Sequence, residues 1–207
     1  MMKAINPKPI ALAFTGASGI PYGLRLLEHL VAAERQIYLM ISPAAQTVFA
    51  METNLKIPSD PKQQTDFFSN YFTAKPNQIT AFGNQQWSAP VASGSNVPEA
   101  MIICPCTSGC IGAIAAGISD NLIERAADVV IKENRKLILV HRETPLSIIH
   151  LENLLKLARL GAIILPANPG FYNQPSTIQD LIDFIVARIL DHLNIPHRLQ
   201  LPWGNTE

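Results

Sequence analysis

The fold is decided by the stretch Ile10-Ala-Leu-Ala-Phe-Thr-Gly-Ala-Ser-Gly-Ile-Pro-Tyr-Gly23. Its apolar start, residues 10–14, predicts a short buried strand, and small residues interrupt the run from Thr15 to Gly19. Leucine and valine then recur at helical spacing after Pro21, which predicts a helix. A loop without bulky side chains lets backbone N–H groups approach a phosphate at the helix N-terminus. The stretch therefore indicates either a site for a phosphate-bearing ligand or a tight turn between strand and helix.

The glycine spacing separates this loop from two common nucleotide sites. Gly16, Gly19 and Gly23 do not follow the G-x-G-x-x-G pattern of dinucleotide-binding proteins, and no Gly-Lys-Ser/Thr of a P-loop follows. Ser18 lies between the glycines, where its hydroxyl can point into the ligand space.

A second unit of the same kind lies in the middle of the chain. Residues 101–106 form an apolar run without alternation, typical of a strand buried on both faces. The small-residue loop 107–110 follows, and residues 111–118 read as a helix. Two such loops at the carboxyl ends of parallel strands can hold one ligand between them.

The rest of the chain continues this alternation of strands and helices. Further strands are predicted at 36–42, 78–82, 136–140 and 162–166, and further helices at 44–53, 66–72, 121–133, 147–160 and 178–193. This order predicts an α/β fold: a three-layer, doubly wound, mostly parallel sheet of the Rossmann or flavodoxin-like kind. We expect one domain over residues 1–207, with a C-terminal tail from about residue 196.

Composition narrows the class of partner. The 207 residues are 48% hydrophobic and only 15% charged, with a formal net charge of zero. A nucleic-acid-binding protein normally carries a basic excess, so we expect no such partner. The scarcity of charge indicates that the chain covers part of its surface by forming a homo-oligomer.

Cysteine usage and the N-terminus indicate a cytoplasmic protein. Cys104, Cys106 and Cys110 cluster in one segment, which suits small buried residues better than a disulfide framework or a zinc site. Lys3, Lys8 and the first apolar run loosely resemble a signal peptide, but that run is short and continues into the glycine loop. No apolar run approaches the about 18 residues that a membrane span needs, so we expect no membrane partner.

The few charged residues suggest where chemistry could occur. Arg142 and Glu143 directly follow a predicted buried strand, while Arg125, Lys132 and Arg188 fall on predicted helices. They are either solvated surface groups or, together with Tyr172, a site for a second phosphate, which arginine grips with two parallel hydrogen bonds. In the second case Glu52 and Glu143 become candidates for proton transfer.

Six motifs together resemble the UbiX-type flavin prenyltransferases, over Ile10 to Trp203 and in the family's order. They are Thr15-Gly-Ala-Ser-Gly, Ile103-Cys-Pro-Cys, Asp120-Asn-Leu-Ile-Glu-Arg-Ala-Ala-Asp128, Arg142-Glu-Thr-Pro, His150-Leu-Glu-Asn-Leu-Leu-Lys-Leu and Pro169-Gly-Phe-Tyr. One departure is His141, which stands where the resemblance leads us to expect an apolar residue or proline.

The resemblance implies an activity and its partners. Members of this family join reduced FMN to the dimethylallyl group of dimethylallyl phosphate without a metal. They release phosphate and make prenylated FMN, the cofactor of UbiD-type decarboxylases. The family also implies a homododecamer with active sites at subunit contacts.

The resemblance further assigns residues to roles. It implies that FMN lies against Gly16, Ala17, Ser18, Ser42, Thr107, Ser108, Gly109, Cys110 and Arg142. It implies that Lys132, Glu143, Tyr172 and Arg188 hold the prenyl phosphate, that Trp87 lines the prenyl chain, and that Arg125 reaches in from a neighbouring subunit. Ser18, Glu52, Lys132 and Glu143 are the candidate catalytic residues, and no metal ligand is expected.

Two alternatives stay open at this point. The first is an FMN-dependent cysteine decarboxylase of the same fold, although the catalytic histidine and the Asn- and Met-containing clamp of such enzymes are not found. The second is a flavin carrier without chemistry of its own, which would need only one phosphate site.

Overall fold

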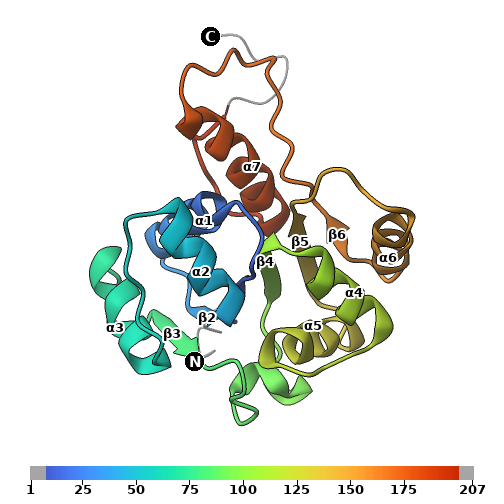
Figure 1. Cartoon of the computed structure of the whole chain (residues 1–207). Helices are drawn as coiled ribbons and strands as arrows, with labels where there is room; N and C mark the ends of the chain where they lie inside the picture. Colours follow the sequence, from blue (N-terminus) through green and yellow to red (C-terminus); the bar gives the residue numbers. More distant parts are fainter. Residues whose placement is uncertain (1–7, 201–207) are drawn as a thin grey trace, which may run out of the picture.

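The computed structural model describes residues 8–200, and its strands form one parallel sheet in the order β3-β2-β1-β4-β5-β6. The strands are β1 (Ile10–Phe14), β2 (Ile37–Ile41), β3 (Ile79–Phe82), β4 (Ala100–Cys106), β5 (Lys136–His141) and β6 (Ile163–Ile164). The chain begins at the centre, winds outward to β3, returns to β4 beside β1, and winds outward again to β6 (Figure 1). This arrangement confirms the predicted doubly wound α/β fold and puts the switch point between β1 and β4.

Helices cover both faces of this sheet. They are α1 (Ile20–Ala32), α2 (Pro43–Glu52), α3 (Pro61–Tyr71), α4 (Ser108–Ala116), α5 (Leu122–Lys132), α6 (Ile148–Arg159) and α7 (Ile178–Leu193). Figure 1 shows α1, α2 and α3 gathered on one side of β4 and α4, α5 and α6 on the other. The predictions for Lys3, Trp203 and the end of the C-terminal tail concern residues outside the described range.

The central strand β1 divides its side chains between two cores. Ile10, Leu12 and Phe14 pack with residues of α1, α2, α3 and α7, while Ala11 and Ala13 pack with residues of α4 and α5. All five residues of β1 are fully buried, as the unalternating apolar run predicts. The carboxyl end of β1 is therefore held from both faces.

Some boundaries differ from the prediction for identifiable reasons. The helix predicted at 66–72 begins earlier, at Pro61, because the side chain of Asp60 accepts a hydrogen bond from the N–H of Gln63 and caps it. The predicted loop 107–110 is instead a cap and first helical turn, because Thr107 caps α4 in the same way. The last strand is shorter than expected, covering only Ile163–Ile164.

Gly23 of α1 tests how closely the helix packs on the sheet. A Cβ at this position would lie 2.5 Å from the carbonyl oxygen of Cys104 and closer still to the ring of Phe14. We expect Gly23→Ala to lower the unfolding free energy by about 2 kcal/mol, because an overpacked core must shift backbone as well as side chains. Urea denaturation followed by circular dichroism measures this change.

Gly112 provides the matched control, since it lies inside α4 and its Cβ would meet only Asn153 Nδ2, at 3.5 Å. Gly112→Ala is expected to be neutral or stabilising by up to about 1 kcal/mol, because alanine favours the helix. Equal effects of the two substitutions would contradict the close packing of α1 on the sheet.

Candidate active site

The carboxyl ends of β1, β2, β4 and β5 bring together most of the predicted flavin-binding residues. Gly16, Ala17 and Ser18 follow β1, Ser42 follows β2, the segment Thr107–Cys110 follows β4, and Arg142 and Glu143 follow β5. In a parallel sheet these ends share one edge, and the edge at the switch point is where such folds bind ligands.

The hydroxyl of Thr15 ties the two small-residue loops together. Its Oγ1 donates a hydrogen bond to the carbonyl of Pro105 at 2.7 Å and accepts one from the N–H of Thr107 at 2.9 Å. The side chain is buried, so its bond to Pro105 is shielded from water, and the bond from Thr107 is partly shielded. Sequence reasoning missed this role, although a threonine directly after a buried strand was a signal for it.

The three helix N-termini at this edge differ in what they hold. At α1 the carboxylate of Glu52 accepts hydrogen bonds from the N–H groups of Gly19 and Ile20, each at 2.9 Å. At α2 and α4 the hydroxyls of Ser42 and Thr107 accept from Ala45 and Cys110. The place where the sequence suggested a phosphate at α1 is thus taken by the chain's own carboxylate.

The β1 loop needs its glycine for close packing. A Cβ at Gly16 would lie 2.5 Å from the Cβ of Ala44 in the first turn of α2, so only glycine fits there. By contrast, a Cβ at Gly109 would meet only Thr107 Oγ1, at 4.0 Å, which leaves open space over the N-terminus of α4. The α4 end is the roomier of the two.

Arg142 carries a buried nitrogen that lacks a partner. Among residues 8–200, its Nε has no hydrogen-bond partner, while its backbone N–H donates to the carbonyl of Cys106. Arg142 as a whole is only partly buried, but a buried N–H group is normally paired, so its Nε is a donor available to an anionic ligand at this edge.

His141, Ser108 and Glu143 form a connected group beside Arg142. Ser108 Oγ lies 2.9 Å from His141 Nε2 and donates to Glu143 Oε2 at 3.1 Å. This hydrogen bond holds the pKa of Glu143 below its ordinary value, and burial lowers the pKa of His141. The sequence marked His141 only as a departure from a pattern.

The remaining predicted residues lie on outer surfaces of the chain. Arg125 pairs with Asp128 on α5, and Lys132 pairs with Glu133 at the end of that helix. Lys132 lies just before the amino end of β5, roughly 16 Å along the strand from Arg142. One chain therefore does not bring Lys132 to the edge where its predicted partners Arg142 and Glu143 lie.

Tyr172 and Arg188 lie along one side of α7. The ring of Tyr172 packs against Phe184 with centroids 5.7 Å apart, and Arg188 is one turn further on, paired with Asp191. Trp87 is half exposed in the turn after β3, whose Asn84 carbonyl accepts a hydrogen bond from the first residue of α5.

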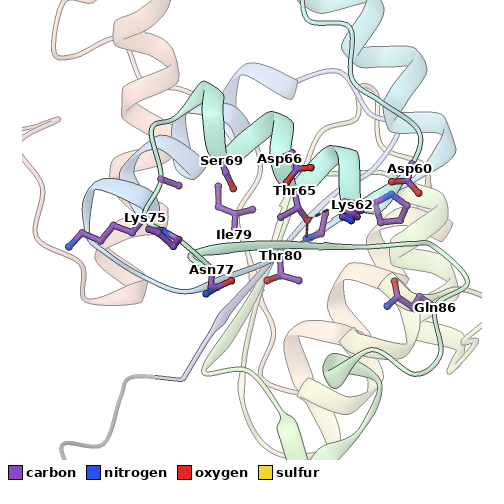
Figure 2. A pocket seen from close by; sticks show the side chains of 14 residues that line it. Asp60, Lys62, Thr65, Asp66, Ser69, Lys75, Asn77, Ile79, Thr80 and Gln86 are labelled. Carbon is purple, nitrogen blue, oxygen red and sulfur yellow. Dashed lines mark hydrogen bonds between the residues drawn. The ribbon is translucent and has the colours of Figure 1, made fainter.

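A groove beside β3, the outermost strand of the sheet, is separate from this site. It has a volume of 840 Å³ and lies between α3 and β3, with Lys62, Asp66 and Thr80 among its lining residues. Figure 2 shows the α3 side chains above the strand. None of the predicted site residues lines it, so it contributes nothing to the flavin site.

The cysteines are buried and unpaired, and burial raises the pKa of the Cys104 thiol. Across residues 8–200, no three His, Cys, Asp or Glu side chains are grouped so that they could hold a metal ion. In the same part of the chain, every helix is too short or too polar to cross a membrane.

The fold and the site define a flavoprotein, and the sequence model of the flavoprotein family matches residues 2–190. Flavin prenyltransferase UbiX of Pseudomonas aeruginosa is 55% identical over 199 residues, which cover 96% of this chain and 95% of that protein. The chain therefore belongs to the UbiX-type flavin prenyltransferases.

Solved structures give the same relationship. The crystal structure of AnUbiX (PadA1) in complex with FMN and dimethylallyl pyrophosphate superposes with a TM-score of 0.85 at 36% identity, covering 97% of this chain and 100% of that one. The dodecameric FMN-dependent UbiX-like decarboxylase from Escherichia coli O157:H7 superposes with a TM-score of 0.83 at 36% identity, covering 95% and 100%.

Thr15 provides a test of how the site is held together. Thr15→Val keeps the shape of the side chain but leaves the N–H of Thr107 without its acceptor. We expect a loss of about 2 kcal/mol in unfolding free energy and weaker FMN binding, because a buried donor would lose its partner. Denaturant titration and flavin fluorescence titration measure the two effects.

Thr15→Ser is the control, because it keeps the hydroxyl and removes only a methyl group. If Thr15→Val matches the serine variant in both measurements, the hydroxyl does not hold the two loops in register.

Proposed function

We propose that this protein is a flavin prenyltransferase that transfers a dimethylallyl group from dimethylallyl phosphate to N5 and C6 of reduced FMN, releasing phosphate and prenylated FMN. The observation that carries this proposal is the unpaired, buried Nε of Arg142 at the carboxyl edge, directly beside Glu143. The relationship to AnUbiX, whose solved complex holds FMN and dimethylallyl pyrophosphate, supports it.

The residues at the carboxyl edge fit a flavin nucleotide. Gly16, Ala17 and Ser18 form a loop of small residues after β1, and the open space at Gly109 leaves room above the N-terminus of α4. Thr107, Ser108 and Cys110 lie at that positive helix end, Ser42 caps the neighbouring α2, and Arg142 would supply the charge that a phosphate needs. Reduced FMN would supply the electron-rich atoms that take the prenyl group.

The leaving phosphate needs fixed cations, since no metal is proposed. We assign Lys132, Arg188 and Arg142 to meet its negative charge, with Tyr172 donating a hydrogen bond. Glu143 and Ser18 would handle the proton of the phosphate, and Glu52 would act as a carboxylate near the flavin. Trp87 would line the space of the prenyl chain.

The positions on α5 require a second copy of the chain. Arg125 and Lys132 are seven residues apart and so lie on one side of α5, where Arg125 donates to the carbonyl of Ala92 and Lys132 lies near the amino end of β5. Both would therefore enter the site of a neighbouring subunit. The family resemblance implied this for Arg125 alone, and we extend it to Lys132.

The surface of α6 supports such an assembly. Ile148, Ile149, Leu151 and Leu155 expose 74%, 68%, 51% and 51% of their surface. Apolar side chains gathered on one helix indicate an interface, and the E. coli relative is dodecameric. We therefore infer a homododecamer.

We further infer a setting for the protein. The buried, unpaired cysteines suit the reducing cytoplasm. A UbiD-type decarboxylase would use the product. We also infer a single domain over residues 1–207, because the described strands join one sheet.

The reaction itself is the first test. Incubation of the protein with reduced FMN, dimethylallyl phosphate and EDTA under anaerobic conditions should yield prenylated FMN, detected by mass spectrometry. Product that forms only after magnesium is added would contradict the role of fixed cations. FMN binding without any adduct would favour a flavin carrier, and decarboxylation of a cysteine peptide would favour that alternative enzyme.

Two variants within this assay separate binding from chemistry. Arg188→Ala should slow transfer about a hundredfold and weaken binding of dimethylallyl phosphate while FMN binding stays intact, because one donor to the leaving group is lost. Glu143→Gln keeps the shape but cannot carry a proton, so it should bind both ligands and turn over poorly. A Glu143→Gln enzyme with unchanged turnover would remove Glu143 from the mechanism.

Shared sites predict recovery of activity in mixed assemblies. Arg125→Ala and Glu143→Ala subunits should each be inactive alone, yet coexpression should restore activity. The reason is that some sites then combine an intact Glu143 with an intact neighbouring Arg125. Co-purification of the two variants, each carrying a different affinity tag, confirms that mixed oligomers form. Mixed oligomers without activity would place Arg125 in its own subunit's site or outside the site altogether.

A further inference from the structure

A hydrogen-bonded chain of three side chains runs from the buried interior to Glu143. His141 is the last residue of β5 and has only 3% of its surface exposed. Its Nε2 lies 2.9 Å from Ser108 Oγ at the start of α4, which in turn lies 3.1 Å from Glu143 Oε2. These two hydrogen bonds connect the interior to a carboxylate at the carboxyl edge, where the predicted flavin-binding residues lie.

The direction of these bonds follows from a count of protons. The hydroxyl of Ser108 has one hydrogen, and the ionised carboxylate of Glu143 can only accept. Ser108 therefore donates to Glu143 and must accept from His141, so the hydrogen lies on His141 Nε2. The imidazole N–H therefore donates to Ser108, and the hydroxyl of Ser108 donates to the carboxylate of Glu143.

The surroundings of His141 favour its neutral form. Burial lowers its pKa, His150 of α6 and Arg142 act in the same direction, and Glu143 opposes them. The ring of His150 lies 6.4 Å from that of His141, and its Nδ1 accepts from the N–H of Ser147. A neutral imidazole with its hydrogen on Nε2 can donate this hydrogen bond without being further protonated.

We propose that His141 is a positioning residue for Glu143, which it holds through Ser108 in one orientation and in its ionised form. His141 fixes the rotation of the Ser108 hydroxyl, and each bond in such a chain strengthens the next. This inference rests on the proposed prenyl transfer for its meaning in catalysis, while the link between the three side chains can be measured without turnover.

The experiment compares His141→Leu, which removes the donor, with His141→Gln, whose amide nitrogen can occupy the place of Nε2. Infrared titration of the carboxylate band, with Glu143→Gln as the subtracted reference, follows the ionisation of Glu143 in the whole protein. Anaerobic prenylation assays across pH give kcat and KM for the same variants.

In His141→Leu we expect the apparent pKa of Glu143 to rise toward its ordinary value, because a donor to the charged form is weakened. The acidic limb of the kcat profile should then move to higher pH. At neutral pH kcat should fall about fivefold with little change in KM for FMN, since one net hydrogen bond is lost. His141→Gln should recover most of both effects.

Two further variants complete the design. Ser108→Ala should shift Glu143 in the same direction, and adding His141→Leu to it should shift Glu143 no further, because both act through one path. His192→Leu is the matched histidine control, since His192 lies on α7 near the amino end of β5, where its carbonyl accepts from Lys136. It should change neither readout.

Each outcome decides the proposal. An unchanged titration of Glu143 in folded His141→Leu overturns it, as does an equal loss in the Leu and Gln variants, which would assign His141 a different role. If His141→Leu does not fold, the comparison of Ser108→Ala with His141→Gln decides in the same way. If the titration of Glu143 shifts in His141→Leu but the wild-type protein makes no prenylated FMN, the proposed function is refuted while the link between His141 and Glu143 stands.

Discussion

The site depends on the buried hydroxyl of Thr15, which joins the ends of β1 and β4. These strands are neighbours in the sheet but lie about ninety residues apart in the sequence, as the bond between Thr15 and Pro105 shows. One oxygen donates to the β4 end and accepts from the first residue beyond it. Because one bond is buried and the other partly buried, the two small-residue loops are held relative to each other. The α4 N-terminus and Ser108 are placed by that register.

Scarcity of charge shapes the rest of the architecture. With 15% charged residues, few groups are available to meet a ligand carrying phosphate. One chain places Arg142 and Glu143 at the carboxyl edge, whereas Lys132 lies near the amino end of β5 and Arg125 is bound to Ala92 and Asp128. The same chain exposes an apolar face on α6. The apolar face can pack against a second subunit, and the cations on α5 can then complete that subunit's site.

Much of the fold could be predicted because it follows from local pattern. The apolar runs of β1 and β4 and the small residues after them define the two central units, and the sheet order follows from winding. The start of α3 was missed because its capping residue, Asp60, lies in a polar segment without apolar periodicity. The contact of Ser108 with His141 depends on the alignment of β4 with β5, which spacing does not report. The position of Lys132 could not be predicted, because spacing alone does not show that α5 ends near the amino end of β5.

Glu52 gives the two similar loops different characters. A site built from two small-residue loops, each opening a helix, would by composition alone accept an elongated ligand in either direction. The carboxylate of Glu52 accepts from the N–H groups of Gly19 and Ile20, so these two donors at the α1 N-terminus are not available to the phosphate of a flavin nucleotide. The α4 end stays open and lies beside Arg142. The two loops, similar in composition, therefore differ in the donors that they leave open, and the difference gives an elongated ligand with one phosphate a preferred direction across the sheet.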